Sequence, residues 1–282
     1  MSRTLLPGRR LAIVLALGLA PAVAFAHAGL DELDAATRQE LAKRPDDPQR
    51  HIERARVLQM KGEWDAALEE VETAAARGGD PDVLGQVRAS IYLDAGFPRM
   101  AKVEVDRVLA RRPDAAGLLY ERGRAWLAIG NPEAAARDFG DAIAKGPRPT
   151  PEQVIAHRDV LLGLGKKDAA LRALDDGMAR VGHVVSLELP AVDLEVELGR
   201  YDAALARLDR LAATAPPNPL WIARRGEVLD KAGRGAQARA EYAKALALID
   251  ARPAARRGKP FVDLKRRLEM ALASAEHRGE SR

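Results

Sequence analysis

The sequence predicts an all-α protein in which helical hairpins follow one another along the chain. Six glycines recur at intervals of 34 or 35 residues, a period typical of one helix–turn–helix unit per repeat. Alanine, leucine, arginine and glutamate recur throughout the 282 residues, and this composition favours helices. The recurring glycines are Gly62, Gly96, Gly130, Gly165, Gly199 and Gly233.

Fixed positions after each glycine predict how the helices pack. The fifth residue after the glycine is always alanine, which is small enough to let two helices approach closely. The ninth residue is larger and apolar, and we expect it to fill the space toward the neighbouring hairpin. The alanines are Ala67, Ala101, Ala135, Ala170, Ala204 and Ala238. The larger residues are Val71, Val105, Phe139, Leu174, Leu208 and Tyr242.

Local signals predict where individual helices begin and end. Gly130 can adopt the left-handed backbone conformation without a Cβ clash, so the first helix of its repeat should end there. Residues 131–132 read Asn-Pro, which predicts a side-chain cap followed by a first-turn proline. Residues 150–153 read Thr-Pro-Glu-Gln and resemble a capping box, and 218–219 repeat the Asn-Pro pattern.

The N-terminal segment is predicted to be a signal peptide over residues 1–26. Three arginines precede an apolar run over 11–20, and Ala-Phe-Ala at 24–26 has the small-x-small form of a signal-peptidase site. An uncleaved anchor or a buried N-terminal helix is the alternative. Residues 27–47 are expected to cap the array through one helix, which the pattern places at 30–43.

The C-terminal segment, residues 251–282, is predicted to be a basic linker followed by a capping helix. The helix would cover the apolar face that the last repeat of a stacked array leaves open. The basic linker residues are Arg252, Arg256, Arg257 and Lys259. The expected apolar stripe is Leu264, Leu268, Ala271, Leu272 and Ala275.

The fifth repeat departs from the pattern of the others. Pro190 lies inside its expected first helix, and residues 192–198 alternate as a strand would. Because the 34-residue period continues through this segment, we predict a helix there, but a short or distorted one. Glu195 also stands where the other repeats hold a large apolar residue.

Residues 48–250 resemble six tetratricopeptide repeats. The closest correspondence lies in residues 116–149, where Gly123, Trp126, Gly130, Ala135, Phe139, Ala142 and Pro147 are in register. The resemblance implies a right-handed superhelical solenoid whose concave groove holds other proteins or peptides. It also implies that the first helix of each hairpin lines this groove.

Eight residues are predicted to face the groove from the first helices. They are Arg56, Ser90, Tyr120, Arg124, Leu127, Asp159, Asp193 and Glu227. Their charges predict a groove that is basic in its first half and acidic in its second. Such a groove would favour an extended peptide with opposite charges at its two ends. A solvated charged face without a ligand is the alternative.

Two further sets of charged residues each allow two interpretations. Arg54, Arg88, Arg122 and Arg225 all stand eight residues before a recurring glycine. They could bind an acidic polymer, but we expect them to pack between helices and pair with carboxylates such as Glu53 and Glu121. Asp193, Glu195 and Glu197 could hold a divalent cation or a basic segment, but a solvated face is the expected arrangement.

The sequence offers no catalytic, metal or cofactor site. It contains no cysteine, and its five histidines lack the spacing of metal ligands. No nucleophile elbow or phosphate-binding loop is present. Without the three leader arginines, the 45 basic residues become 42 against 41 acidic ones, a balance that argues against a nucleic-acid partner.

These observations predict a non-enzymatic, exported scaffold that binds a protein or peptide segment. We expect it to be periplasmic or secreted, in a Gram-negative bacterium. A structural accessory subunit of an outer-membrane, pilus or polysaccharide assembly machine is the alternative, and an RNA-binding repeat protein or an enzyme is disfavoured. The basic linker could add a weak contact with anionic lipid headgroups. The sequence makes no prediction of the oligomeric state.

Overall fold

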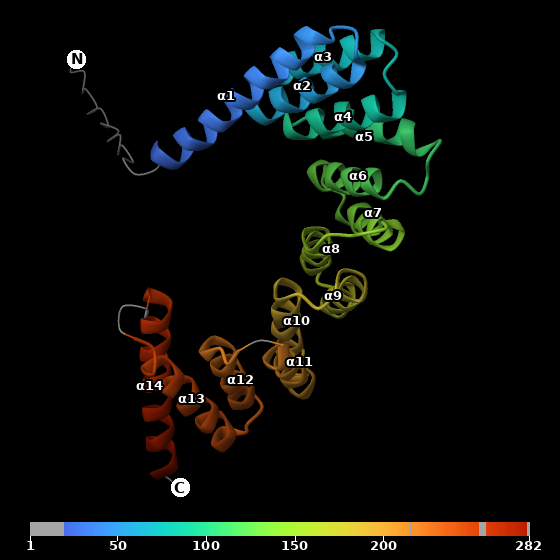
Figure 1. Cartoon of the computed structure of the whole chain (residues 1–282). Coiled ribbons are helices and arrows are strands. Elements are labelled where there is room, and N and C mark those ends of the chain that lie inside the picture. Colours follow the sequence, from blue (N-terminus) through green and yellow to red (C-terminus); the bar gives the residue numbers. More distant parts are fainter. Residues whose placement is uncertain (1–19, 215, 254–257, 281–282) are drawn as a thin grey trace, which may run out of the picture. The chain divides into compact units, whose positions relative to one another are not determined.

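The chain folds into helices that follow one another in pairs (Figure 1). The computed structural model describes residues 20–214, 216–253 and 258–280, and its side chains over 29–213, 216–253 and 258–273. This described part contains fourteen helices and no strand, so the predicted all-α repeat array is confirmed. None of these helices is both long and apolar enough to span a membrane.

Two compact units make up the chain, one ending at Val108 and the other beginning at Leu109. The first unit holds α1 (Ala20–Lys43), α2 (Pro48–Lys61), α3 (Trp64–Ala76), α4 (Pro81–Asp94) and α5 (Pro98–Leu109). The second begins with α6 (Ala116–Ile129), α7 (Pro132–Lys145), α8 (Pro151–Gly163) and α9 (Lys167–Val181). It continues with α10 (Val185–Glu197), α11 (Tyr201–Thr214), α12 (Pro219–Lys231), α13 (Gly235–Asp250) and α14 (Lys259–Glu280).

The recurring glycines turn the chain between the two helices of each pair. All six have positive φ values between 72° and 87°, the left-handed region that other residues adopt only with strain. The predicted caps also form, since the side chains of Asn131, Thr150 and Asn218 each accept a backbone hydrogen bond from the first turn that follows. Thr150 and Gln153 complete the capping box.

The predicted packing positions form the interior of the array. Every alanine five residues after a recurring glycine is fully buried, and every larger residue nine after it is buried. In two repeats the ninth residue is aromatic and the residue that faces it on the first helix is glycine. The aromatic rings of Phe139 and Tyr242 pack against Gly123 and Gly226, where a Cβ atom would lie within 2.5 Å of a ring carbon.

The N-terminal helix α1 packs against α2 through a buried carboxylate. Asp34 accepts hydrogen bonds from Lys61 at 2.9 Å, from Arg54 at 3.3 Å and from Arg38 at 2.7 Å. The helix already includes Ala20, the first described residue, so it extends at least ten residues before the start expected from the sequence pattern. The predicted signal peptide lies outside the described residues up to position 19, and no side chain before residue 29 is described.

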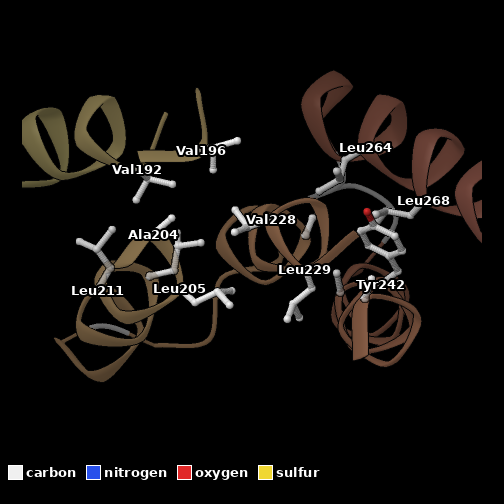
Figure 2. Close-up of a cluster of buried hydrophobic side chains, with 14 of the residues drawn as sticks. Val192, Val196, Ala204, Leu205, Leu211, Val228, Leu229, Tyr242, Leu264 and Leu268 are labelled. Carbon is white, nitrogen blue, oxygen red and sulfur yellow. The ribbon is translucent and has the colours of Figure 1, made fainter. Parts of the chain in front are cut away.

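The C-terminal helix α14 lies against the last repeat. Leu264 and Leu268 are buried in the same cluster as Tyr242 (Figure 2). Ala271 and Leu272 pack at its edge, whereas the side chain of Ala275 lies outside the described residues. Of the basic linker, Arg252 stacks over the Phe261 ring at 4.2 Å, and Arg256 and Arg257 lie outside the described residues.

The helix of the fifth repeat forms as predicted and is not short. The helix α10 has thirteen residues, as α8 and α12 do, and Pro190 lies within it. Proline removes the hydrogen bond to the carbonyl four residues earlier, which belongs to Ser186. Ser186 is exposed, so water can hydrate that carbonyl. Burial of Leu187, Ala191 and Leu194 holds the segment helical despite the missing bond.

Candidate functional site

An open groove runs between α10 and α12, the first helices of the fifth and sixth repeats. Its volume is about 590 Å³. Leu189, Asp193, Val196 and Glu197 line it from α10, and Leu220, Trp221, Arg224 and Lys231 line it from α12. The groove therefore combines an apolar surface with charged groups.

Helical periodicity explains why these side chains share the groove. Leu189, Asp193 and Val196 are spaced by four and three residues, so they lie on one face of α10. Ala191, Val192 and Leu194 on the same helix point into the core instead. Trp221 reaches both environments, because it lines the groove and packs at the edge of the buried cluster.

Arg224 connects the two sides of the groove. Its guanidinium donates to Asp193 on α10 and, at 2.8 Å, to Glu227 on its own helix. Burial acts to lower the pKa of Arg224, but the hydrogen bond to Glu227 and the charge of Asp193 outweigh it and raise that pKa. The side chain therefore stays charged and keeps both acids compensated.

The predicted groove residues of the second unit are only partly brought together. Asp193 lines the groove, and Glu227 joins it through Arg224. Asp159, on α8, pairs with Arg158 at 2.5 Å and lies outside the groove lining. Each of these three acids therefore has a cationic partner.

The other predicted residues lie elsewhere. The Tyr120 ring packs 5.1 Å from the Phe139 ring, Arg124 bonds Glu121 at 2.9 Å, and Leu127 is exposed on α6. Burial raises the pKa of the Tyr120 hydroxyl, so it stays protonated. In the first unit, Arg56 is exposed and Ser90 accepts a hydrogen bond from Gln59 at 2.8 Å.

Sequence reasoning missed Leu220, Trp221 and Arg224 as groove residues. Trp221 stands twelve residues before Gly233, and its size distinguishes it from its equivalents in the other repeats. These equivalents are Arg50, Leu84, Leu118, Gln153 and Leu187. Three of them are buried leucines, so the register alone indicates a core position.

The arginines that stand eight residues before a recurring glycine have a structural role. Four arginines each bind an acid sixteen residues later, on the second helix of the same repeat. The pairs are Arg54–Glu70 at 2.7 Å, Arg88–Glu104 at 3.2 Å, Arg122–Asp138 at 2.7 Å and Arg225–Glu241 at 3.2 Å. The expected pairing with carboxylates is confirmed. Of the acids named from the sequence, Glu53 pairs with Arg50 and Glu121 with Arg124, on the same first helices.

The expected acidic cluster of the fifth repeat does not form. Residues two apart on a helix point to nearly opposite sides, so Asp193 and Glu197 are exposed while Glu195 is buried. The predicted solvated face is therefore wrong for Glu195, which bonds Arg207 at 2.8 Å. Among the side chains described, no group of three histidines and acids could hold a metal ion.

A tetratricopeptide repeat model matches residues 87–151 and 189–256. These two segments are similar to tetratricopeptide repeats. The second match includes all the residues that line the groove, from Leu189 to Lys231, and the comparisons support this family for the chain. No curated protein matches the sequence.

Several solved structures align with this chain at low sequence identity. The C-terminal part of a tetratricopeptide repeat protein from Cytophaga hutchinsonii aligns with a TM-score of 0.58 and 14% identity, over 86% of this chain and 97% of that one. A tetratricopeptide repeat protein from Parabacteroides merdae aligns with a TM-score of 0.46 and 17% identity, over 88% and 96%. YrrB, described as having an unusual peptide-binding site, aligns with a TM-score of 0.45 and 14% identity, over 83% and 98%. The first of these supports the repeat fold.

Proposed function

We propose that the protein is a non-enzymatic scaffold that binds a segment of another protein in the groove between α10 and α12. The observation that carries this proposal is the groove itself, in which an aromatic and three aliphatic side chains surround a bridged ion pair. Its volume lies within the range of about 300–1,000 Å³ that is usual for ligand sites. It therefore has room for one or two bulky side chains of a partner.

The charges of the groove favour recognition by apolar contact. Asp193 is compensated by Arg224, and Glu197 by Lys167 at 2.8 Å, so neither acid requires a ligand cation. Leu220 is 41% exposed, and covering it with a partner side chain would remove apolar surface from water. The bound segment would insert a bulky apolar residue between Leu220 and Leu189.

Export to the bacterial cell envelope is part of the proposal. It is supported by the basic start, the apolar run over 11–20 and the small residues at 24–26. A permanent accessory subunit of an envelope assembly machine is the alternative. It would use the same groove, but its complex with the partner would last longer than that of a scaffold.

Affinity capture of the tagged full-length chain from its host tests both partner binding in the groove and export. We expect Leu220→Asp to reduce recovery of the bound partner about tenfold or more, because a charge would enter an apolar contact. Asp is tolerated in the first turn of a helix, so α12 should remain folded. Mass spectrometry of the captured chain should find a new N-terminus near residue 27.

Val185→Asp is the matched control. Val185 lies in the first turn of α10, is 40% exposed and does not line the groove. Equal loss of partner in both variants, or in neither, would contradict the groove as the binding surface. An intact N-terminus on the captured chain would contradict cleavage of a leader.

A further inference from the structure

The fifth repeat reverses the ion pairing found in four other repeats. Where those repeats carry arginine on the first helix, the fifth has Ala191, and where they carry an acid on the second helix, it has Arg207. The acids that compensate Arg207 come from two helices, Glu188 and Glu195 on α10 and Asp175 on α9. The guanidinium thus joins three consecutive helices.

The cluster around Arg207 is buried and closely bonded. Arg207 donates from Nε to Glu195 at 2.8 Å, from Nη1 to Glu188 at 3.2 Å and from Nη2 to Asp175 at 2.6 Å. Glu188, Glu195 and Arg207 are only 1%, 4% and 7% exposed. His183, which is mostly exposed, contacts Glu188 through Nδ1 at 2.7 Å.

The cluster holds more negative than positive charge. Three carboxylates surround one guanidinium, and Arg210 on α11 is the next cation that acts on Glu195. Moreover, Oε2 of Glu195 is buried and has no hydrogen-bond partner among the described residues. An ionised carboxylate is costly in such a position, and a bound proton would remove its charge.

The same helix connects the cluster to the groove. In α10, Glu188 and Glu195 face Arg207, while their neighbours Leu189 and Val196 line the groove. A change in the bonds to Glu195 therefore acts on the backbone that carries the groove side chains. Trp221 lies on the other wall and would experience a displacement of α10.

We propose that Glu195 binds a proton in this cluster and that the proton adjusts the position of α10 along the groove. Glu195 is thus a positioning residue for the site, and its role in ligand binding rests on the proposed function. The proton binding itself requires no ligand, so it can be measured on the protein alone.

The direction of the pH dependence follows from the surroundings of Glu195. Burial raises the pKa of this carboxyl above its ordinary value of 4.5, and the hydrogen bond and charge of Arg207 only partly offset the rise. The charge of Asp175 raises this pKa further, and that of Arg210 lowers it. Between 4.5 and the raised pKa, the folded chain therefore holds a proton that the unfolded chain has released. This contribution to stability is full below pH 4.5 and is lost as the pH rises through the raised pKa.

The experiment uses the full chain labelled with 5-fluorotryptophan. The sequence has three tryptophans, so ¹⁹F NMR gives one signal each from Trp64, Trp126 and Trp221. Between pH 8 and pH 4.5 we expect the Trp221 signal to shift with a midpoint above 4.5. In Glu195→Gln this shift should disappear, while the other two signals serve as internal controls.

His183→Gln is the matched control, because His183 is the other titratable group bonded to the cluster from its exposed side. We expect the Trp221 titration to persist in this variant. A flat Trp221 signal in the wild-type chain, the same titration in Glu195→Gln, or its loss in His183→Gln alone would each overturn the proposal. A flat wild-type signal overturns the proposal whether or not the variants fold. Failure of partner capture would leave this titration untouched, so the two proposals can fail separately.

Discussion

Arg207→Met is expected to destabilise the second unit by about 3–5 kcal/mol, because it leaves two buried carboxylates without their cation. Glu188 and Glu195 are almost completely buried, and the Arg207 guanidinium bonds both. Methionine approximates the aliphatic part of the arginine side chain, so the loss would come from charge rather than from a cavity. Urea denaturation at pH 8, followed by circular dichroism, measures the change.

Two further variants separate this effect from a general loss of surface charge. Arg200→Met removes an arginine whose pair with Asp168 is about half exposed, and it should cost less than about 1 kcal/mol. Adding Glu188→Gln and Glu195→Gln to Arg207→Met should recover most of the stability. If Arg207→Met were no more harmful than Arg200→Met, the buried cluster would not hold these helices together.

Gly226→Ala is expected to destabilise the sixth repeat by about 2 kcal/mol, although alanine is the better helix former. A Cβ at this position would lie 2.4 Å from Cε1 and 2.5 Å from Cδ1 of Tyr242. The ring is buried and rigid, so the helices must separate, and overpacking of this kind costs about 1–3 kcal/mol. The gain of about 1 kcal/mol in helix propensity does not compensate a contact this short.

Gly163→Ala is the control, because it makes the same change in a helix where nothing lies within 4 Å of the new Cβ. It should leave stability unchanged or raise it by up to about 1 kcal/mol. The two variants are compared by the midpoints of their urea denaturation curves, provided that the dependence of the unfolding free energy on urea concentration is the same in both. Equal effects in Gly226→Ala and Gly163→Ala would show that the Tyr242 ring does not set the helix spacing.

The repeat fold could be predicted because each repeat meets the same physical requirements. A left-handed turn selects glycine, a close helix approach selects alanine, and both recur in register from Gly62 to Gly233. Even the pairing of Gly226 with Tyr242 follows from the sequence once the register is known, since a small residue must face a large one. The caps at Asn131 and Thr150 are local, and local signals need no tertiary information.

The groove and the buried cluster could not be predicted in the same way, because both depend on how helices rotate against one another. Trp221 occupies a register that is core in three other repeats, and only the packed structure shows its groove-facing side. Glu195 was expected on a solvated face because it lies among other acids, whereas it is buried and bonds Arg207, twelve residues later. The other repeats hold apolar residues at the position equivalent to Glu195, so the repeat pattern does not indicate this ion pair.

A photo-crosslinking side chain placed at position 220 tests most directly whether the groove between α10 and α12 is the binding surface. The same side chain at position 185 gives the matched comparison, because both sites are about 40% exposed and lie in the first turn of a first helix. Our account predicts that the partner crosslinks at position 220 and not at position 185. Crosslinks that form equally at both positions, or only at position 185, would contradict it.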